Sequence, residues 1–152
     1  MIKKKILVTG AAGFIGSKIC SELLKKKYTV IGCDDFSSGL KKNVIKGIKF
    51  LNIDLSNKKK ISILPKNIDY IFHLAGQSSG EKSFEDPIND LNRNFITTYN
   101  LIDFAKKNFI KNFFYASSMS VYGNSVSKAN INANCKPLSY YGLHKKLSED
   151  YI

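Results

Sequence analysis

The sequence predicts an α/β protein built on a doubly wound parallel sheet of about five strands. Short apolar runs that suit buried strands alternate along the chain with longer segments of helical periodicity. A glycine-rich turn joins the first of these strands to the first helix. Because the strand runs are apolar without interruption, both faces of the sheet should be covered, and the alternation predicts parallel crossovers.

Five apolar runs are predicted as strands. In chain order they are "KKILVTG" (4–10), "YTVIGC" (28–33), "IKFLNI" (48–53), "IDYIFHLA" (68–75) and "KNFFYAS" (111–117). Their lengths fit strands better than helices. A polar stretch that holds the short segment "SNKKKISILP" separates the third run from the fourth.

Three segments are predicted as helices. The first is 14–27, with lysines in its last turn, where they suit the helix dipole. A long helix is expected between Asp86 and Asn108, and the closing segment is helical from about Ser139. The apolar positions recur every three or four residues, which favours packing of one face on the sheet. They are Ile15, Ile19, Leu23 and Leu24 in the first helix, and Ile88, Leu91, Phe95, Thr98, Ile102 and Ala105 in the long one.

Length and composition indicate one globular domain over residues 1–152. The chain is 43% hydrophobic, which is enough for a core, and it has no repeat or obvious linker. It has no apolar run of membrane-spanning length and no signal peptide, so we expect a cytoplasmic location and no membrane partner. The three cysteines, Cys20, Cys33 and Cys135, follow no metal-ligand spacing, so we expect neither a disulfide framework nor a metal site.

The formal net charge of +12 raises the possibility of nucleic-acid binding. However, Arg93 is the single arginine among 24 basic residues, and the lysines stand in short groups at the ends of apolar segments. No nucleic-acid-binding module is recognisable in the sequence. We therefore expect no nucleic-acid partner, and a compositional bias toward lysine explains the charge.

The turn "VTGAAGFIG" lies between the first strand and the first helix, the context in which a glycine triplet has meaning. Gly10 would allow the tight turn, Gly13 the approach of a pyrophosphate, and Gly16 the close packing of helix on strand. The amides at the helix N-terminus would then face the phosphates. This predicts a dinucleotide site of the Rossmann type.

Two acidic residues follow predicted strands where such a site needs them. Asp34 comes after the second strand, about 20 residues past the glycine turn, where a carboxylate can accept both ribose hydroxyls of an adenosine. That favours NAD over NADP, because a carboxylate would repel a 2′-phosphate. Asp34 is equally compatible with a turn former in "CDDFSSG". Asp54 would flank an adenine ring, or it could cap the short helix that follows.

The chemistry is expected near the end of the chain. "YASSMSVYG" places serines at the carboxyl edge of the fifth strand, where ligands of open α/β sheets bind. Tyr141 and Lys145 would share a helix face, so the ammonium could favour a phenolate and Ser118 could complete a proton relay. Tyrosine and lysine four apart also occur by chance on surfaces. Downstream of a dinucleotide fingerprint, the pair becomes specific.

These motifs together resemble the NAD-dependent epimerase/dehydratase family of extended short-chain dehydrogenases/reductases, and within it the nucleotide-sugar epimerases of the UDP-glucose 4-epimerase type. The resemblance runs from Ile6 to the last residue and is carried by "TGAAGFIG", Asp34, "HLAG", Asn94, "SSMSVYG" and the Tyr141 to Lys145 pair. It implies NAD as the cofactor and a nucleotide sugar, most simply a UDP-hexose, as the substrate.

The resemblance also assigns roles to residues. Gly10, Gly13, Phe14, Ile15 and Gly16 would hold the pyrophosphate, Asp34 and Asp35 would face the ribose, and Asp54 and Leu55 would border the adenine. Leu74, Ala75 and Gly76 would line the cofactor cleft, with Ser117 near the nicotinamide and Asn94 supporting the site. Lys145 would bond the nicotinamide ribose, Tyr141 would be the base, and Ser118 would bond the reacting sugar hydroxyl.

The implied reaction oxidises a sugar hydroxyl to a keto intermediate and returns the hydride to the other face. Dehydration is disfavoured, because relatives that eliminate water carry Thr-Asp-Glu where this chain has Ser118, Met119 and Ser120. A reductase or dehydrogenase of the same family and a non-catalytic NAD-binding module are the alternatives.

Family members are longer, so the chain resembles the amino-terminal part of such an enzyme, ending within the catalytic helix. The fragment alone is expected to bind NAD weakly, to turn over no sugar, and to aggregate through an exposed edge at "NFFYAS". The complete enzyme is expected to be a homodimer through the helices at 86–108 and from Ser139.

Overall fold

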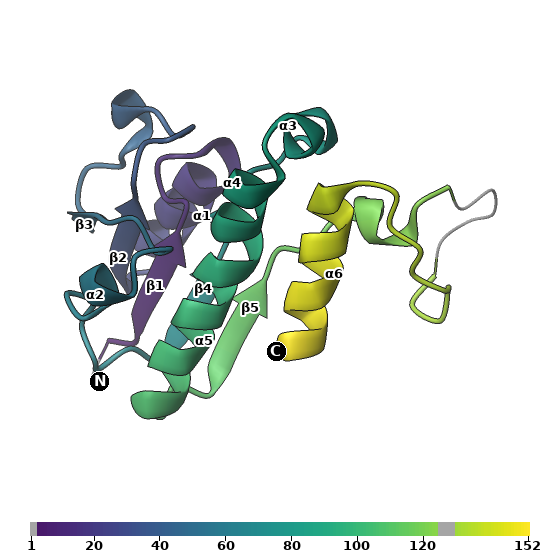
Figure 1. Ribbon diagram of the computed structural model, residues 1–152. Coiled ribbons are helices and arrows are strands. Elements are labelled where there is room, and N and C mark those ends of the chain that lie inside the picture. The colour runs from purple at the N-terminus through teal and green to yellow at the C-terminus, as the bar shows by residue number, and fades with distance from the viewer. Residues whose placement is uncertain (1–2, 125–129) are drawn as a thin grey trace. The chain divides into compact units, whose positions relative to one another are not determined.

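The computed structural model describes residues 3–124 and 130–152 (Figure 1). The chain divides into two compact units. We call Met1–Ala75 with Asn100–Ala116 the sheet unit, and Gly76–Tyr99 with Ser117–Ile152 the helical unit.

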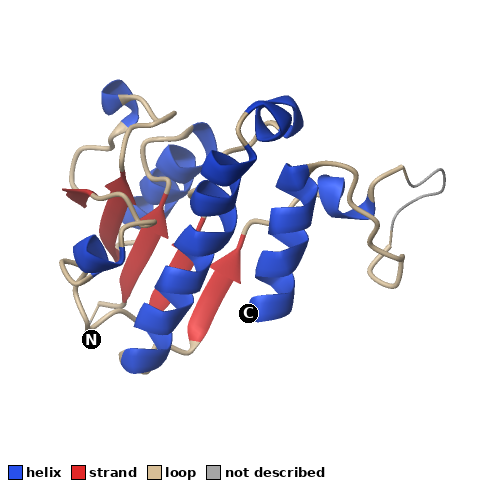
Figure 2. Ribbon diagram, in the orientation of Figure 1, coloured by secondary structure: helices blue, strands red, loops and turns tan. Residues whose placement is uncertain are grey.

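The sheet unit contains a five-stranded parallel sheet. Its strands, red in Figure 2 and labelled in Figure 1, are β1 (Lys5–Thr9), β2 (Thr29–Asp34), β3 (Lys49–Asn52), β4 (Tyr70–His73) and β5 (Asn112–Tyr115). Their order in the sheet is β3-β2-β1-β4-β5. Four of the predicted runs contain their strands, and β2 extends one residue past its run, to Asp34, so the predicted α/β class and parallel sheet are confirmed. The chain adds strands on one side of β1 and then crosses to the other, which creates a switch point between β1 and β4, where open α/β sheets bind ligands.

Both faces of the strands β1 and β2 are buried, as their uninterrupted apolar runs predict, whereas the edge strands β3 and β5 are only partly covered and Phe114 of β5 is 52% exposed. Ile6 and Val8 of β1 pack on one face with Cys20 of α1 (Phe14–Lys25). Leu7 packs on the other face with Leu101 of α5 (Thr97–Lys107). The short elements α2 (Lys58–Ile61) and η1, a 3-10 turn (Lys41–Asn43), complete the connections.

The first helix differs from its prediction in two details. It ends at Lys25 rather than at residue 27, because Lys27 adopts a positive φ of 63° and turns the chain into β2. Ile15 is 60% exposed, so it is not part of the packed face. The reason is its place in the first helical turn, directly after the glycine turn, whereas Ile19 and Leu23 lie further along the helix and contact the core.

The helical unit contains α3 (Gly80–Glu85), α4 (Pro87–Leu91), the π-helical turn η2 (Asn92–Ile96), the first turn of α5, the 3-10 turn η3 (Met119–Tyr122) and α6 (Tyr140–Tyr151). The closing helix begins as predicted, because Ser139 caps it by accepting a hydrogen bond from the amide of Gly142 at 3.0 Å. No helix in the described part of the chain is both long and apolar enough to cross a membrane.

The prediction of one regular helix from Asp86 to Asn108 was wrong at its centre. A π-helical turn interrupts it at Asn92–Ile96, where the hydroxyls of Thr97 and Thr98 donate to the carbonyl oxygens of Asn92 and Asn94 at 2.9 and 2.6 Å. The extra residue rotates the later part of the helix relative to the earlier part. Ile88, which precedes this turn, lies exposed, while Thr98, which follows it, is buried.

Candidate active site

The glycine turn of the sheet unit has the close approaches that its sequence predicts. Gly10 has a φ of +67°, and a Cβ there would lie 2.9 Å from the Ala75 amide nitrogen. A Cβ on Gly16 would lie only 2.0 Å from the Gly10 carbonyl oxygen. No larger residue fits either position without moving backbone, so both glycines are structural requirements of this turn.

The N-terminus of α1 is open to a ligand. Gly13 is its N-cap and has no side chain to occupy the first amides, and the next two residues, Phe14 and Ile15, are exposed. Unused amides and the positive end of the dipole make such a terminus suitable for phosphate. The predicted pyrophosphate residues therefore lie together in one turn.

Asp34 connects β2 to this turn. Its Oδ2 accepts a hydrogen bond from the Ala12 amide at 3.0 Å, and its Oδ1 accepts one from the Phe36 amide at 2.8 Å. Asp34 is thus a turn former as well as a candidate ribose ligand. Since a carboxylate has about four acceptor sites, these two bonds leave capacity for two ribose hydroxyls.

The other acidic candidates lie in loops of the sheet unit. Asp35 accepts a bond from the Ser37 amide at 2.9 Å, and Asp54 accepts bonds from both the amide and the hydroxyl of Ser56. Asn57, not Asp54, caps α2, so that alternative for Asp54 was wrong. Leu55 is a buried core residue.

A hydroxyl that sequence reasoning missed fixes the edge between β1 and β4. The Thr9 hydroxyl oxygen accepts hydrogen bonds from the amides of Leu74 and Ala75 at 3.1 and 3.0 Å. The hydroxyl proton of Thr9 is then available to the Nδ1 atom of His73, which lies 2.8 Å from the hydroxyl oxygen. With Nδ1 as the acceptor, a neutral His73 ring carries its own proton on Nε2. The backbone that would line the cofactor cleft is therefore held by one buried side chain.

The helical unit brings Tyr141 and Lys145 together on α6, as their spacing predicts. Both are buried, and the Lys145 ammonium lies 5.9 Å from the centre of the Tyr141 ring. Burial lowers the pKa of Lys145 to about 8, while the carboxylate of Asp90 acts in the opposite direction. A lysine that titrates so close to neutral pH is unusual outside functional sites.

Asn94 lies in the π-helical turn of the same unit. It is 1% exposed, and its Nδ2 donates to Asp90 at 2.9 Å, while its Oδ1 has no hydrogen-bond partner. A Cβ placed on Gly76 would lie 2.6 Å from this Oδ1 and 3.6 Å from the Lys145 ammonium nitrogen. Gly76, Asn94 and Lys145 thus share one small space, as a common site requires.

The serines lie on and before η3 in the helical unit. Ser118 caps this 3-10 turn, and its hydroxyl donates to the hydroxyl of Ser120 at 3.2 Å. Ser117 is exposed. Gly142 lets η3 approach α6, because a Cβ there would lie 2.5 Å from the Ser120 carbonyl oxygen. The structure places the turn that Ser118 caps next to α6 but engages the Ser118 hydroxyl within that turn.

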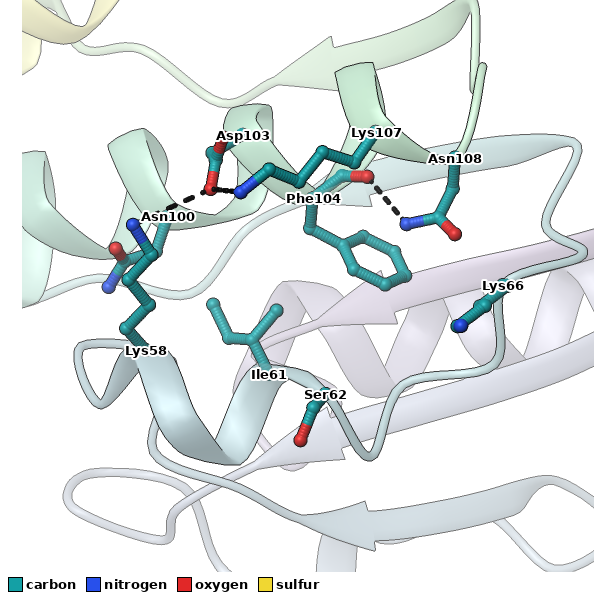
Figure 3. Close-up of a pocket in the computed structure, with 9 residues that line it drawn as sticks. All are labelled: Lys58, Ile61, Ser62, Lys66, Asn100, Asp103, Phe104, Lys107 and Asn108. Atoms are coloured by element: carbon teal, nitrogen blue, oxygen red, sulfur yellow. Dashed lines mark hydrogen bonds and ion pairs between the residues drawn. The ribbon is translucent and has the colours of Figure 1, made fainter.

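Other features of the described residues carry no sign of chemistry. They contain no cluster of metal-ligating side chains, and burial raises the pKa of the Cys20 thiol to about 11 and that of Cys33 further, so both thiols are unreactive. A pocket of about 410 Å³ lies between α2 and α5 of the sheet unit (Figure 3). None of the predicted site residues lines it.

Comparisons with known proteins agree with this geometry. The model of the NAD dependent epimerase/dehydratase family matches residues 6–152. The uncharacterized UDP-glucose epimerase YtcB of Bacillus subtilis is 40% identical to this chain, over 95% of this chain and 49% of its own length. UDP-glucuronic acid decarboxylase 1 of Danio rerio is 36% identical over 80% of this chain and 29% of its own length.

Two solved epimerases show the same fold. UDP-glucose 4-epimerase of Thermotoga maritima, solved with UDP-glucose, matches with a TM-score of 0.91 and 32% identity over 97% of this chain and 49% of that one. The enzyme of Thermus thermophilus in complex with NAD matches with a TM-score of 0.91 and 31% identity over the same shares. The chain spans about half the length of these relatives. With a family match over nearly its whole length, it belongs to the NAD dependent epimerase/dehydratase family.

Proposed function

We propose that the protein carrying this chain is an NAD-dependent nucleotide-sugar epimerase that acts on a UDP-hexose. The observation that carries the proposal is the buried pair of Tyr141 and Lys145, with a Lys145 pKa of about 8. A buried lysine this close to neutrality can support a tyrosine as an acid and base, whereas a binding module has no need of it.

The residues present fit NAD. The turn from Gly10 to Gly16 keeps its tight path because a Cβ on Gly10 or Gly16 would meet backbone at 2.9 or 2.0 Å, and it leads into open helix amides. Asp34 supports NAD rather than NADP, because its carboxylate would repel a 2′-phosphate. The unpaired Oδ1 of Asn94 is a buried acceptor suited to a ligand hydroxyl. We propose residues 1–152 as the NAD-binding domain.

Three side chains of this chain would carry the proton chemistry. Tyr141, as phenolate, takes the proton of the sugar hydroxyl and later returns it. Lys145 stabilises the phenolate by its charge and bonds the ribose of the cofactor. Ser118 turns its hydroxyl from Ser120 to the sugar oxygen. When bound, NAD supplies the hydride acceptor and donor of the reaction.

Two features favour epimerisation over the other reactions of the family. Met119 cannot carry a proton and Ser120 is a weak base, so elimination of water lacks its acid and base. Relatives with high similarity include UDP-glucose epimerases, and the Thermotoga maritima enzyme was solved with UDP-glucose. A reductase or dehydrogenase of the same family is the alternative, since it would use the same three residues.

A chimera tests the proposal, because relatives are about twice as long as this chain. Residues 1–152 would replace the matching half of the Thermotoga maritima epimerase, and conversion of UDP-glucose to UDP-galactose would be measured. We expect turnover, and Tyr141→Phe should abolish most of it while NAD stays bound. Tyr140→Phe, on the exposed neighbour, is the matched control and should be nearly silent. Stoichiometric consumption of NADH with a keto-sugar, without epimerisation, would favour the reductase.

A further inference from the structure

Asp90 is the centre of a buried hydrogen-bond network in the helical unit. Its Oδ1 accepts from Nε2 of Gln77 at 2.8 Å and from Nδ2 of Asn94 at 2.9 Å, and its Oδ2 accepts from Nδ1 of His144 at 2.6 Å. The carboxylate is 1% exposed. An ionised carboxylate can only accept hydrogen bonds, so the donors of all three contacts are the partners of Asp90. The proton between Asp90 and His144 therefore belongs to Nδ1 of His144.

The network determines where Asn94 points. An amide group is planar, so the bond from Nδ2 to Asp90 fixes the direction of Oδ1. That oxygen is buried without a partner and faces the same point beside Gly76 as the Lys145 ammonium. A freely rotating amide could instead turn its NH₂ toward the ammonium, which would place donor against donor.

The network also holds the catalytic helix. His144 directly precedes Lys145 on α6, so its bond to Asp90 ties α6 to α4 beside the lysine. The same carboxylate opposes the loss of the Lys145 proton that burial favours. This buried hydrogen bond therefore fixes the position of α6 beside the lysine.

We propose that Asp90 is a positioning residue of the proposed active site, orienting the Asn94 amide and α6 so that the Asn94 carbonyl oxygen and the Lys145 ammonium face one space. Its catalytic meaning rests on the proposed function, whereas the geometry is tested on its own. Asp90 acts through Asn94, His144 and Lys145 and touches no reacting group itself.

Several other charged and titratable groups lie on α6 or on the elements packed against it. Besides Lys145, α6 carries Tyr140, Tyr141, His144, Lys146, Glu149, Asp150 and Tyr151, and the packed elements carry Glu81, Lys82, Glu85, Asp90, Arg93 and Tyr122. Among them Asp90 is the charge that raises the Lys145 pKa. Removing this charge should therefore move the titration of Lys145 to lower pH.

The test is Asp90→Asn in the 152-residue chain, read by NMR titration of lysines labelled with ¹³C at Cε. In the wild type, one lysine should titrate near pH 8. In the variant that titration should move to lower pH by about one unit, since a neighbouring opposite charge is lost. Asp90→Glu keeps the charge, so Lys145 should titrate close to its wild-type pH in that variant. Asp103→Asn removes an exposed ion-pair partner of Lys58 and Lys107 and should leave the titration unchanged.

An unchanged Lys145 titration in a folded Asp90→Asn chain would overturn the inference. Should that variant not fold, His144→Leu removes one donor and keeps the charge. Amide hydrogen exchange around Lys145 should then accelerate at least about tenfold, and unchanged exchange would count against the inference. Neither measurement needs turnover, so an inactive chimera would reject the proposed function without deciding this one. In an active chimera, Asp90→Asn should shift the alkaline limb of the pH profile to lower pH.

Discussion

Gly16→Ala tests the geometry of the glycine turn more directly than any other single change. The alanine Cβ would lie 2.0 Å from the Gly10 carbonyl oxygen and 2.7 Å from its carbon. Ordinary contact requires more than about 3 Å, so either α1 or the turn has to move by about 1 Å. Since both atoms are backbone, no side-chain rotation can relieve the clash.

Helix propensity acts in the opposite direction. Alanine is more favourable than glycine inside a helix by about 1 kcal/mol. Overpacking of a closely packed contact costs about 1–3 kcal/mol, and this overlap is severe, so the net effect should be a loss of about 1–2 kcal/mol in the free energy of unfolding. For a chain of this size, that lowers Tm by about 2–8 °C.

The assay is urea unfolding followed by circular dichroism, with Gly80→Ala as the matched control. Gly80 also lies in a helix, but its nearest neighbours would be 3.8 Å from an added Cβ, so alanine should be neutral or stabilising there. If Gly16→Ala were as stable as the wild type, helix propensity would dominate, and the close contact that defines this turn would be refuted.

The buried polar groups give two other predictions. Thr9→Val keeps the shape but leaves the amides of Leu74 and Ala75 without their acceptor, so the free energy of unfolding should fall by about 2–4 kcal/mol in urea melts, whereas Thr9→Ser should retain most of it. The pKa of Lys145 is about 8 in the folded chain against 10.5 ordinarily, so between these two pH values the unfolded state binds more protons than the folded state. The free energy of unfolding should therefore rise with pH across that window, by up to about 3 kcal/mol. The free energy of unfolding of the wild type and of Lys145→Met, measured at about pH 7 and pH 10, isolates this contribution. A difference between the two proteins that is the same at both pH values would contradict it.

The sheet could be predicted from the sequence because its signals are local. Each strand is a continuous apolar run between polar segments, and the glycine turn follows the first of them directly. The π-helical turn at Asn92–Ile96 could not be predicted, because periodicities of three and four tolerate one extra residue. The short helix α3 was missed because six residues hold too little pattern.

The candidate site also contains residues that the sequence predicts and residues that it does not. The pairing of Tyr141 and Lys145 could be predicted, because residues four apart share one helix face and the dinucleotide fingerprint upstream makes the pair specific. Asp90 was missed because its partner His144 is 54 residues away, and only tertiary structure brings the two together. Thr9 was missed for the same reason, as its hydroxyl serves backbone amides more than 60 residues further on.

The central claim is that the glycine turn and Asp34 bind NAD in preference to NADP. The most direct measurement is a titration of the 152-residue chain with each dinucleotide, followed by saturation-transfer NMR, which detects millimolar as well as tighter binding. We expect saturable binding of NAD and at least about tenfold weaker binding of NADP, a difference of about 1.4 kcal/mol. Equal or tighter binding of NADP would contradict the role of Asp34, and a chain that binds neither dinucleotide would contradict the site itself.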